Sequence, residues 1–158
     1  MNKEDYIFLY QRDLKKLKAE IAAYNDEDSL WKKIPGTINS GGNLCQHLIG
    51  NLKTYIGLQL GNFPYVRNRE AEFSARLFSK AQLLNELDIL LVIIPESIRK
   101  LSENQLDAKF PHDVLIIDES QSIGLVLMHL AMHLAYHTGQ INYHRRTNEF
   151  YNPLASTE

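Results

Sequence analysis

Four of the six histidines of the chain lie in one stretch, residues 128–146. In an α-helix, at roughly 100° per residue, their side chains fall within one arc of about 80°, beside an apolar stripe. Neutral imidazole is the commonest protein metal ligand, and two histidines four residues apart can direct two nitrogens at one ion, as in the helical H-E-x-x-H motif. His133 and His137 have this spacing and predict a metal-binding helix that borders the core. The same arc also holds His129, Gln140 and His144.

A third ligand is expected from another helix. A three-histidine site with one position left for water is the catalytic kind of zinc site. His47 is the best candidate, because it is the only other histidine inside a predicted helix and lies on a polar strip with Gly50 and Asn51. Asn51 and Gln140 are suited to hydrogen bonds with the ligands or with a bound water. The alternative for His47, a core histidine bonded to backbone or water, stays open, because spacing cannot establish a contact between helices.

The other polar candidates are expected to have other roles. His129 and His144 lie more than one turn from the centre of the pair, so surface or supporting positions are expected for both, and His112 is expected in a solvent-exposed loop. Cys45 lies about 200° round the helix from His47, and a small buried hydrophobe is the better interpretation of it.

Two arginines, Arg67 and Arg69, follow the second predicted helix. Surface ion pairs are expected for them, with Glu70 or Glu72 as partners. The alternative is a position at the mouth of a pocket, where they could bind a carboxylate of a ligand.

Four long helices are predicted to position these residues. Apolar residues recur at helical spacing, and Ser, Asn and Pro mark the ends and one expected kink, at Pro95. The fold class predicted is all-α, an antiparallel four-helix bundle, in which sites are built from facing helices. A short segment at residues 112–118 could be extended. The predicted helices run from about Lys3 to Tyr24, from about Asn43 to Leu60 with an N-cap at Ser40 or Asn43, from Ser79 past Pro95, and from about Ser122 to Arg146 or slightly beyond.

Composition bounds the remaining possibilities. The 158 residues, 44% of them hydrophobic and 23% charged, predict a single globular domain over residues 1–158, with 150–158 as a loosely ordered tail. A net charge of -2 argues against nucleic acid as a partner. The single cysteine excludes an internal disulfide framework and fits a reducing compartment. With no signal-like or membrane-spanning run, a cytoplasmic protein without a membrane partner is expected.

Together these motifs resemble the DinB-like family, the superfamily of damage- or stress-inducible four-helix proteins that includes the bacillithiol transferases, and in particular its uncharacterised cytosolic branch. The resemblance covers nearly the whole chain. It rests on Trp31 with the turn at Ile34, Pro35 and Gly36, on Gly42-Asn43-Leu44 leading to His47-Leu48-Ile49-Gly50-Asn51, on the segment from Arg67 to Phe73, and on HLAYHTGQI from His133 to Ile141.

The resemblance implies a bundle of DinB-like type and a divalent metal, whether zinc, nickel, iron or manganese, held by His47, His133 and His137. It implies thiol S-transferase chemistry, in which coordination lowers the pKa of a small-molecule thiol and the thiolate attacks an electrophile. The same site could activate water, as in a metal-dependent hydrolase. An alternative of another class is a stress-related metal-binding or interaction protein without turnover, and a plain bundle whose histidines bind nothing is a weaker one. A homodimer is also implied.

Overall fold

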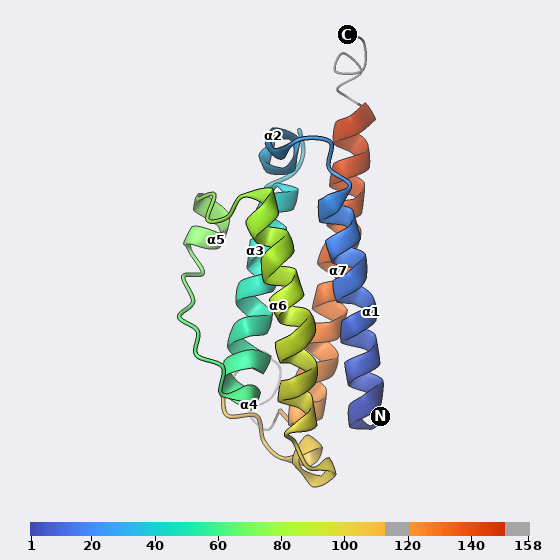
Figure 1. The fold of residues 1–158 in the computed structure, drawn as a ribbon, viewed down its shortest axis with the longest axis vertical. Coiled ribbons are helices and arrows are strands. Elements are labelled where there is room, and N and C mark those ends of the chain that lie inside the picture. The colour runs from blue at the N-terminus through green and yellow to red at the C-terminus, as the bar shows by residue number, and fades with distance from the viewer. Residues whose placement is uncertain (113–120, 151–158) are drawn as a thin grey trace.

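The computed structural model describes residues 1–112 and 121–150, apart from the side chains of residues 149 and 150 (Figure 1). Over these ranges the chain is all-α, as predicted, and its only β-type pairing is an isolated bridge between Lys109 and Ser122. Nearly all of the expected extended segment (112–118) and of the expected tail (150–158) lies outside the described residues. None of the described helices combines the length and hydropathy that crossing a membrane requires.

Four long helical segments lie side by side, joined by short helices (Figure 1). Each corresponds to one of the four predicted helices. The long segments are α1 (Lys3–Ala22), α3 (Gly41–Leu52) with its continuation through the π-helix η1 (Lys53–Leu58) into α4 (Gln59–Gly61), α6 (Lys80–Arg99) and α7 (Ile123–Phe150). The short helices are α2 (Glu27–Trp31), α5 (Ala71–Ser74) and the 3-10 helix η2 (Glu103–Asp107).

The helices do not simply alternate in direction. In Figure 1, α1 and α7 run upward, whereas α3 and α6 both run downward. Two consecutive long segments with the same direction require a connection that returns along the outside. Residues 62–79, which include α5 and are called the crossover below, make this return beside α3 (Figure 1). Asn62 starts it with a left-handed backbone (φ 57°), a conformation that asparagine tolerates at a helix end.

Local hydrogen bonds explain where the site-bearing helices begin. The Ser40 hydroxyl accepts from the Asn43 backbone N–H (3.1 Å), and the Asn43 side chain accepts from the Ser40 N–H (3.2 Å), which forms a capping box and settles the predicted N-cap at Ser40. The Ser122 hydroxyl accepts from the Leu125 N–H (3.1 Å) at the start of α7. The third predicted helix, α6, continues through Pro95 as expected.

The core lies between α1, α3, α6 and α7. Its largest fully buried side chains include Tyr10 and Leu14 of α1 and Leu48 of α3. The Tyr10 hydroxyl donates to the Leu127 carbonyl (2.6 Å), which ties α1 to α7 inside the core. Every residue of α3 is buried, so any polar side chain on that helix faces protein and needs a partner there.

Candidate metal centre

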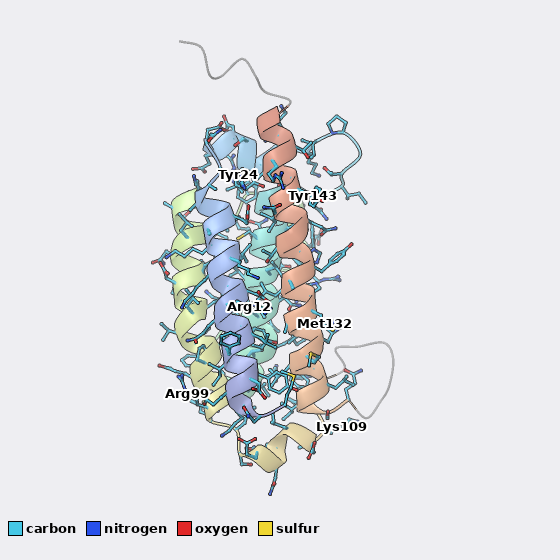
Figure 2. All side chains as sticks on the ribbon, turned by 90° about the vertical axis from the view of Figure 1, so that its right-hand side faces the viewer. Arg12, Tyr24, Arg99, Lys109, Met132 and Tyr143 are labelled. Carbon is cyan, nitrogen blue, oxygen red and sulfur yellow. The ribbon has the colours of Figure 1, made fainter. Side chains whose placement is uncertain are left out.

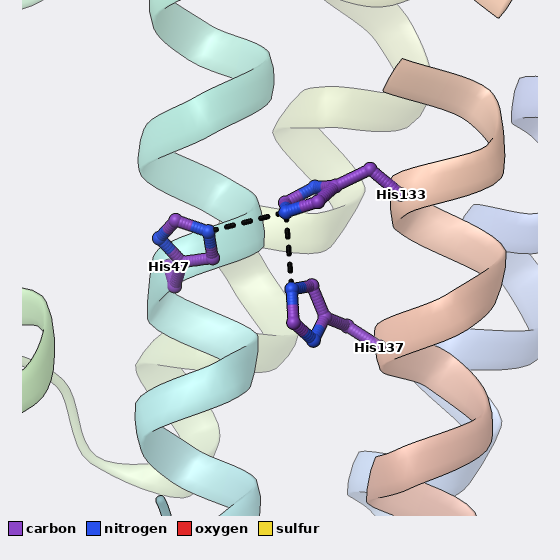
Figure 3. A group of neighbouring side chains, drawn as sticks. All are labelled: His47, His133 and His137. Carbon is purple, nitrogen blue, oxygen red and sulfur yellow. Dashed lines mark hydrogen bonds between the residues drawn. The ribbon is translucent and has the colours of Figure 1, made fainter. Parts of the chain in front are cut away.

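Three histidines from two facing helices meet between α3 and α7. His47 lies in the middle of α3, and His133 and His137 lie one turn apart on α7 (Figure 3). The Nε2 atom of His133 is 3.4 Å from Nε2 of His47 and 3.0 Å from Nε2 of His137. One ligand atom from each of the three lies within 4.8 Å of the others. The structure thus brings together the three histidines that the sequence singled out.

Two of the three nitrogen separations are close to those of a tetrahedral metal site. Metal–nitrogen bonds of 2.0–2.1 Å at tetrahedral angles place two ligand nitrogens about 3.3 Å apart. The two separations from His133, 3.0 and 3.4 Å, bracket this value. The three imidazoles therefore fit a single divalent ion.

A buried carboxylate sets the tautomer of His47. Nδ1 of His47 lies 2.8 Å from Oε2 of Glu72, a residue only 2% exposed. Burial alone would raise the pKa of Glu72, but hydrogen bonds from His47 and Arg67 more than offset it and lower that pKa. An ionised carboxylate only accepts, so Nδ1 of His47 donates and its Nε2 presents a lone pair to the other histidines.

An amide sets the tautomer of His137 in the same way. Oε1 of Gln140 lies 2.6 Å from Nδ1 of His137, while Nε2 of Gln140 donates to the Tyr136 hydroxyl (3.2 Å). The amide oxygen only accepts, so His137 donates from Nδ1 and its Nε2 also carries a lone pair. Gln140 thus contacts His137, the neighbour to which the sequence assigned it.

His133 stands at the centre of the group. Its pKa is lowered to about 3, first by burial and then by the neighbouring His137, His47, His129 and Arg67. Burial also lowers the pKa of His137. Both rings are therefore neutral at pH 7, which is the form that binds metal. Nδ1 of His133 is buried and has no hydrogen-bond partner among the described residues.

The group holds three protein ligands among the described side chains. Over residues 1–112 and 121–148, no further His, Cys, Asp or Glu joins the three histidines. His129 stacks on His133, with ring centroids 6.2 Å apart and planes 23° apart, but it is not part of the group. Three imidazoles with a free position are typical of catalytic sites, whereas structural sites close all four positions.

Arg67 and Glu72 lie behind His47, a contact that the sequence did not predict. The expected ion pair of Arg67 with Glu72 is confirmed by two bonds, of 2.7 and 2.8 Å, but the expected surface position is wrong, because the side chain of Arg67 is only 12% exposed. Its Nη2 also lies 3.2 Å from Nδ1 of His47. Arg69, by contrast, is exposed. The sequence feature that could have indicated a close contact at this point of α3 is Gly50. A Cβ at position 50 would overlap Oε1 of Glu72.

The other candidates divide between buried and exposed positions. Asn51 is buried one turn after His47, and its Oδ1 has no hydrogen-bond partner among the described residues. Cys45 is fully buried, as predicted, and burial raises its pKa. His112 is exposed, also as predicted.

His144 does not lie where it was expected, at the surface or in support of the site. It is buried, and its Nε2 donates to the Lys32 carbonyl (2.8 Å) while its Nδ1 accepts from the Tyr24 hydroxyl (2.7 Å). Both nitrogens are therefore engaged, and the residue fastens α7 to the segment that follows α1. The close approach of Tyr24 and of Gly41, whose Cβ position lies 3.3 Å from Nδ1 of His144, accounts for the burial.

Comparison with known proteins identifies one family. A family model described as "Protein of unknown function (DUF1572)" matches residues 4–151. Neither the curated proteins nor the solved structures contain a match to the chain.

Proposed function

The chain belongs to the DUF1572 family of proteins of unknown function, and we propose that it is a metal-dependent enzyme that transfers a small-molecule thiol of the bacillithiol type to an electrophilic substrate. One observation carries the proposal. The Nε2 atoms of His47, His133 and His137 converge, and no fourth protein ligand joins them within the described ranges. The free position is available to a reactant.

The residues of the chain prepare the site for this chemistry. Glu72 and Gln140 hold the Nδ1 protons of His47 and His137, so the Nε2 lone pairs of both rings point to the same place. A divalent ion held by these nitrogens, whether zinc, nickel, iron or manganese, would supply the Lewis acidity that lowers the pKa of a thiol or water and yields a nucleophile at neutral pH. In the transfer, the thiol loses its proton to solvent, a sulfur–carbon bond forms, and the leaving group departs with the bonding electrons.

The finer structural expectations form part of the same proposal. The motif resemblance and the all-helical fold, with ligands on two facing helices, support a bundle of DinB-like type that acts in the cytoplasm. A homodimer formed through α7 is supported by large apolar side chains on its outer face. Met132, labelled in Figure 2, and Tyr136 are each 65% exposed on this helix. A second copy of the chain would remove these side chains from water.

A metal-dependent hydrolase is the second candidate. The observation that favours it is the same set of three ligands, which leaves room for water as well as for a thiol. The ligand geometry is common to both reactions, so turnover with and without a thiol distinguishes them.

The first experiment is metal quantification of protein purified without a histidine tag. Stoichiometric metal is expected in the wild type and in His129→Ala, because His129 only stacks on the ligand His133. Loss of the metal is expected in His137→Ala, which removes one of the three converging nitrogens. A wild type without metal, or a His137→Ala variant that retains it fully, would contradict the proposed site.

The second experiment is turnover by the metal-loaded protein. Bacillithiol and mycothiol are each supplied with 1-chloro-2,4-dinitrobenzene as the electrophile, and the product is followed by absorbance. Thiol-dependent product that disappears in His137→Ala supports the transferase. Thiol-independent hydrolysis supports the hydrolase instead, and bound metal without any turnover supports a binding protein.

A further inference from the structure

A cleft of about 470 Å³ lies between the loop that follows α2, the first turn of α3 and the later half of α7, and none of the three histidines lines it. Leu44, one turn before His47 on α3, forms one wall, and Gln140 and Tyr143, which follow His137 on α7, form another. The third wall is the loop between α2 and α3, from which Ile38 takes part. This volume falls within the range of pockets that bind small molecules.

Gln140 joins the cleft to the histidines. The same side chain that lines the cleft accepts the Nδ1 proton of His137 (2.6 Å). Gln140 is therefore the residue that the cleft shares with the surroundings of the metal centre, which it contacts on the Nδ1 side of the His137 ring.

The lining of the cleft carries no charge. None of its ten described lining residues is Asp, Glu, Lys or Arg. Its one histidine, His144, is buried with both nitrogens engaged, and burial lowers its pKa, so the ring is neutral. The other side chains are apolar or neutral amides and hydroxyls, such as Leu44 and Thr147. A charged ligand group would lose its hydration here without gaining an ionic partner.

We propose that this cleft binds the neutral, largely apolar part of the electrophilic substrate, such as an aromatic ring, and holds its reacting carbon toward the three histidines. The inference rests on the proposed function, whose reaction needs an electrophile next to the activated thiol. It assigns the cleft to the electrophile because small cellular thiols that carry carboxylates find no cation in its lining. The thiol therefore reaches the site from outside the cleft.

Two unreactive probes of matched shape test this assignment. The neutral probe is 1,3-dinitrobenzene, and the anionic probe is 3,5-dinitrobenzoate. Binding is measured from backbone amide shifts in NMR spectra of the full chain, loaded with metal. The neutral probe is expected to shift the amides of Ile38, Leu44, Gln140 and Tyr143 and to bind at least about tenfold more tightly than the anion. Equal binding of the anion, or shifts confined to other elements, would overturn the assignment.

Substitutions in the cleft provide the second arm. Ile38 is 84% exposed, so Ile38→Asp places a carboxylate on the wall without disturbing the core, and the affinity for 1,3-dinitrobenzene is expected to fall at least about tenfold. Thr147→Trp, which fills the cleft, should abolish the binding. Val92→Asp is the control, because Val92 is 55% exposed on α6 and does not line the cleft. Unchanged affinity in both cleft variants would refute the proposal.

Metal content is measured on the same samples to separate the two proposals. The cleft substitutions touch none of the three histidines, so metal binding should persist in them. Loss of neutral-probe binding with the metal retained supports the cleft assignment. A wild type that binds no metal refutes the proposed function, whereas the probe shifts still decide whether the cleft accepts a neutral, apolar group.

Discussion

Glu72 connects a predicted metal ligand to the rest of the chain. Its two carboxylate oxygens face Arg67 and the Nδ1 atom of His47, and the group is almost fully buried. A carboxylate behind a histidine ligand fixes the ring and raises its basicity. The ion pair with Arg67 keeps this carboxylate charged, so one residue of the crossover determines how His47 presents its lone pair.

The substitution Glu72→Gln is expected to lower the metal affinity about 10- to 100-fold. The substitution preserves the shape of the side chain. It removes the negative charge that strengthens the hydrogen bond from His47, and it leaves the charge of Arg67 without its partner. The affinity is measured by competition with a chromophoric chelator. Glu70→Gln is the matched control, because Glu70 lies on the same segment but is exposed. Equal affinities in the two variants would show that His47 does not depend on the carboxylate.

His144 is expected to make stability depend on pH. Burial lowers its pKa, and the bond to the Lys32 carbonyl only partly opposes this effect. The pKa of this histidine in the unfolded chain is about 6.5. Below that pH the unfolded chain therefore binds a proton that the folded chain does not bind, and the free energy of unfolding falls as the pH falls toward the folded pKa. One such group contributes at most about 1.4 kcal/mol per pH unit.

Chemical denaturation between pH 7.5 and 5 in the presence of a chelator measures this dependence. His144→Gln should show a shallower fall in the free energy of unfolding than the wild type, whereas His112→Gln, at an exposed position, should match the wild type. The histidines of the metal centre contribute equally to all three proteins. Parallel curves for His144→Gln and the wild type would exclude this role of His144.

At the scale of elements, the features that depend on residues close together in the sequence could be predicted. The spacing of His133 and His137 follows from one helix alone, and the Ser40 cap follows from residues three apart. The π-helix η1 was not predicted, because the apolar spacing of this segment is compatible with an α-helix, which is far commoner than a π-helix. The contact of Glu72 with His47 was also out of reach, since it depends on how the crossover lies against α3.

Gly50 reserves the space that this contact needs. A Cβ at position 50 would overlap Oε1 of Glu72 and lie 3.2 Å from Nε of Arg67. Gly50→Ala is therefore expected to displace the carboxylate and to weaken metal binding at least about tenfold, although alanine is the better helix former. Chelator competition measures the affinity.

Gly139→Ala is the matched control for this prediction. Gly139 also lies inside a helix, α7, but nothing stands within 4 Å of the position of its Cβ. The substitution should raise the free energy of unfolding by about 1 kcal/mol and leave the metal affinity unchanged. Retained affinity in Gly50→Ala would mean that Glu72 can shift without cost to the site.

For the whole molecule, the three histidines join helices that are distant in sequence. A bound ion would link α3 to α7 and, through Glu72, to the crossover. Free metal at 100 times its dissociation constant would stabilise the folded state by about 2.7 kcal/mol. In a chain of this size, that raises the unfolding midpoint by roughly 5–10 °C.

Scanning calorimetry with and without saturating zinc measures this shift. The wild type should show it, and His137→Ala should show none. If neither zinc nor chelator changes the unfolding midpoint of the wild type, the ion does not stabilise the folded chain.

The crossover supplies no ligand, and yet its Glu72 holds one in place. Coupling between two sites is reciprocal. If bound metal stabilises the conformation of residues 62–79, a change that destabilises this conformation must lower the metal affinity by the same coupling free energy. A ligand or partner that binds only the outer side of this segment can thus act as an effector, because it changes the metal affinity of the three histidines. It would load or empty the metal centre without ever touching the ion.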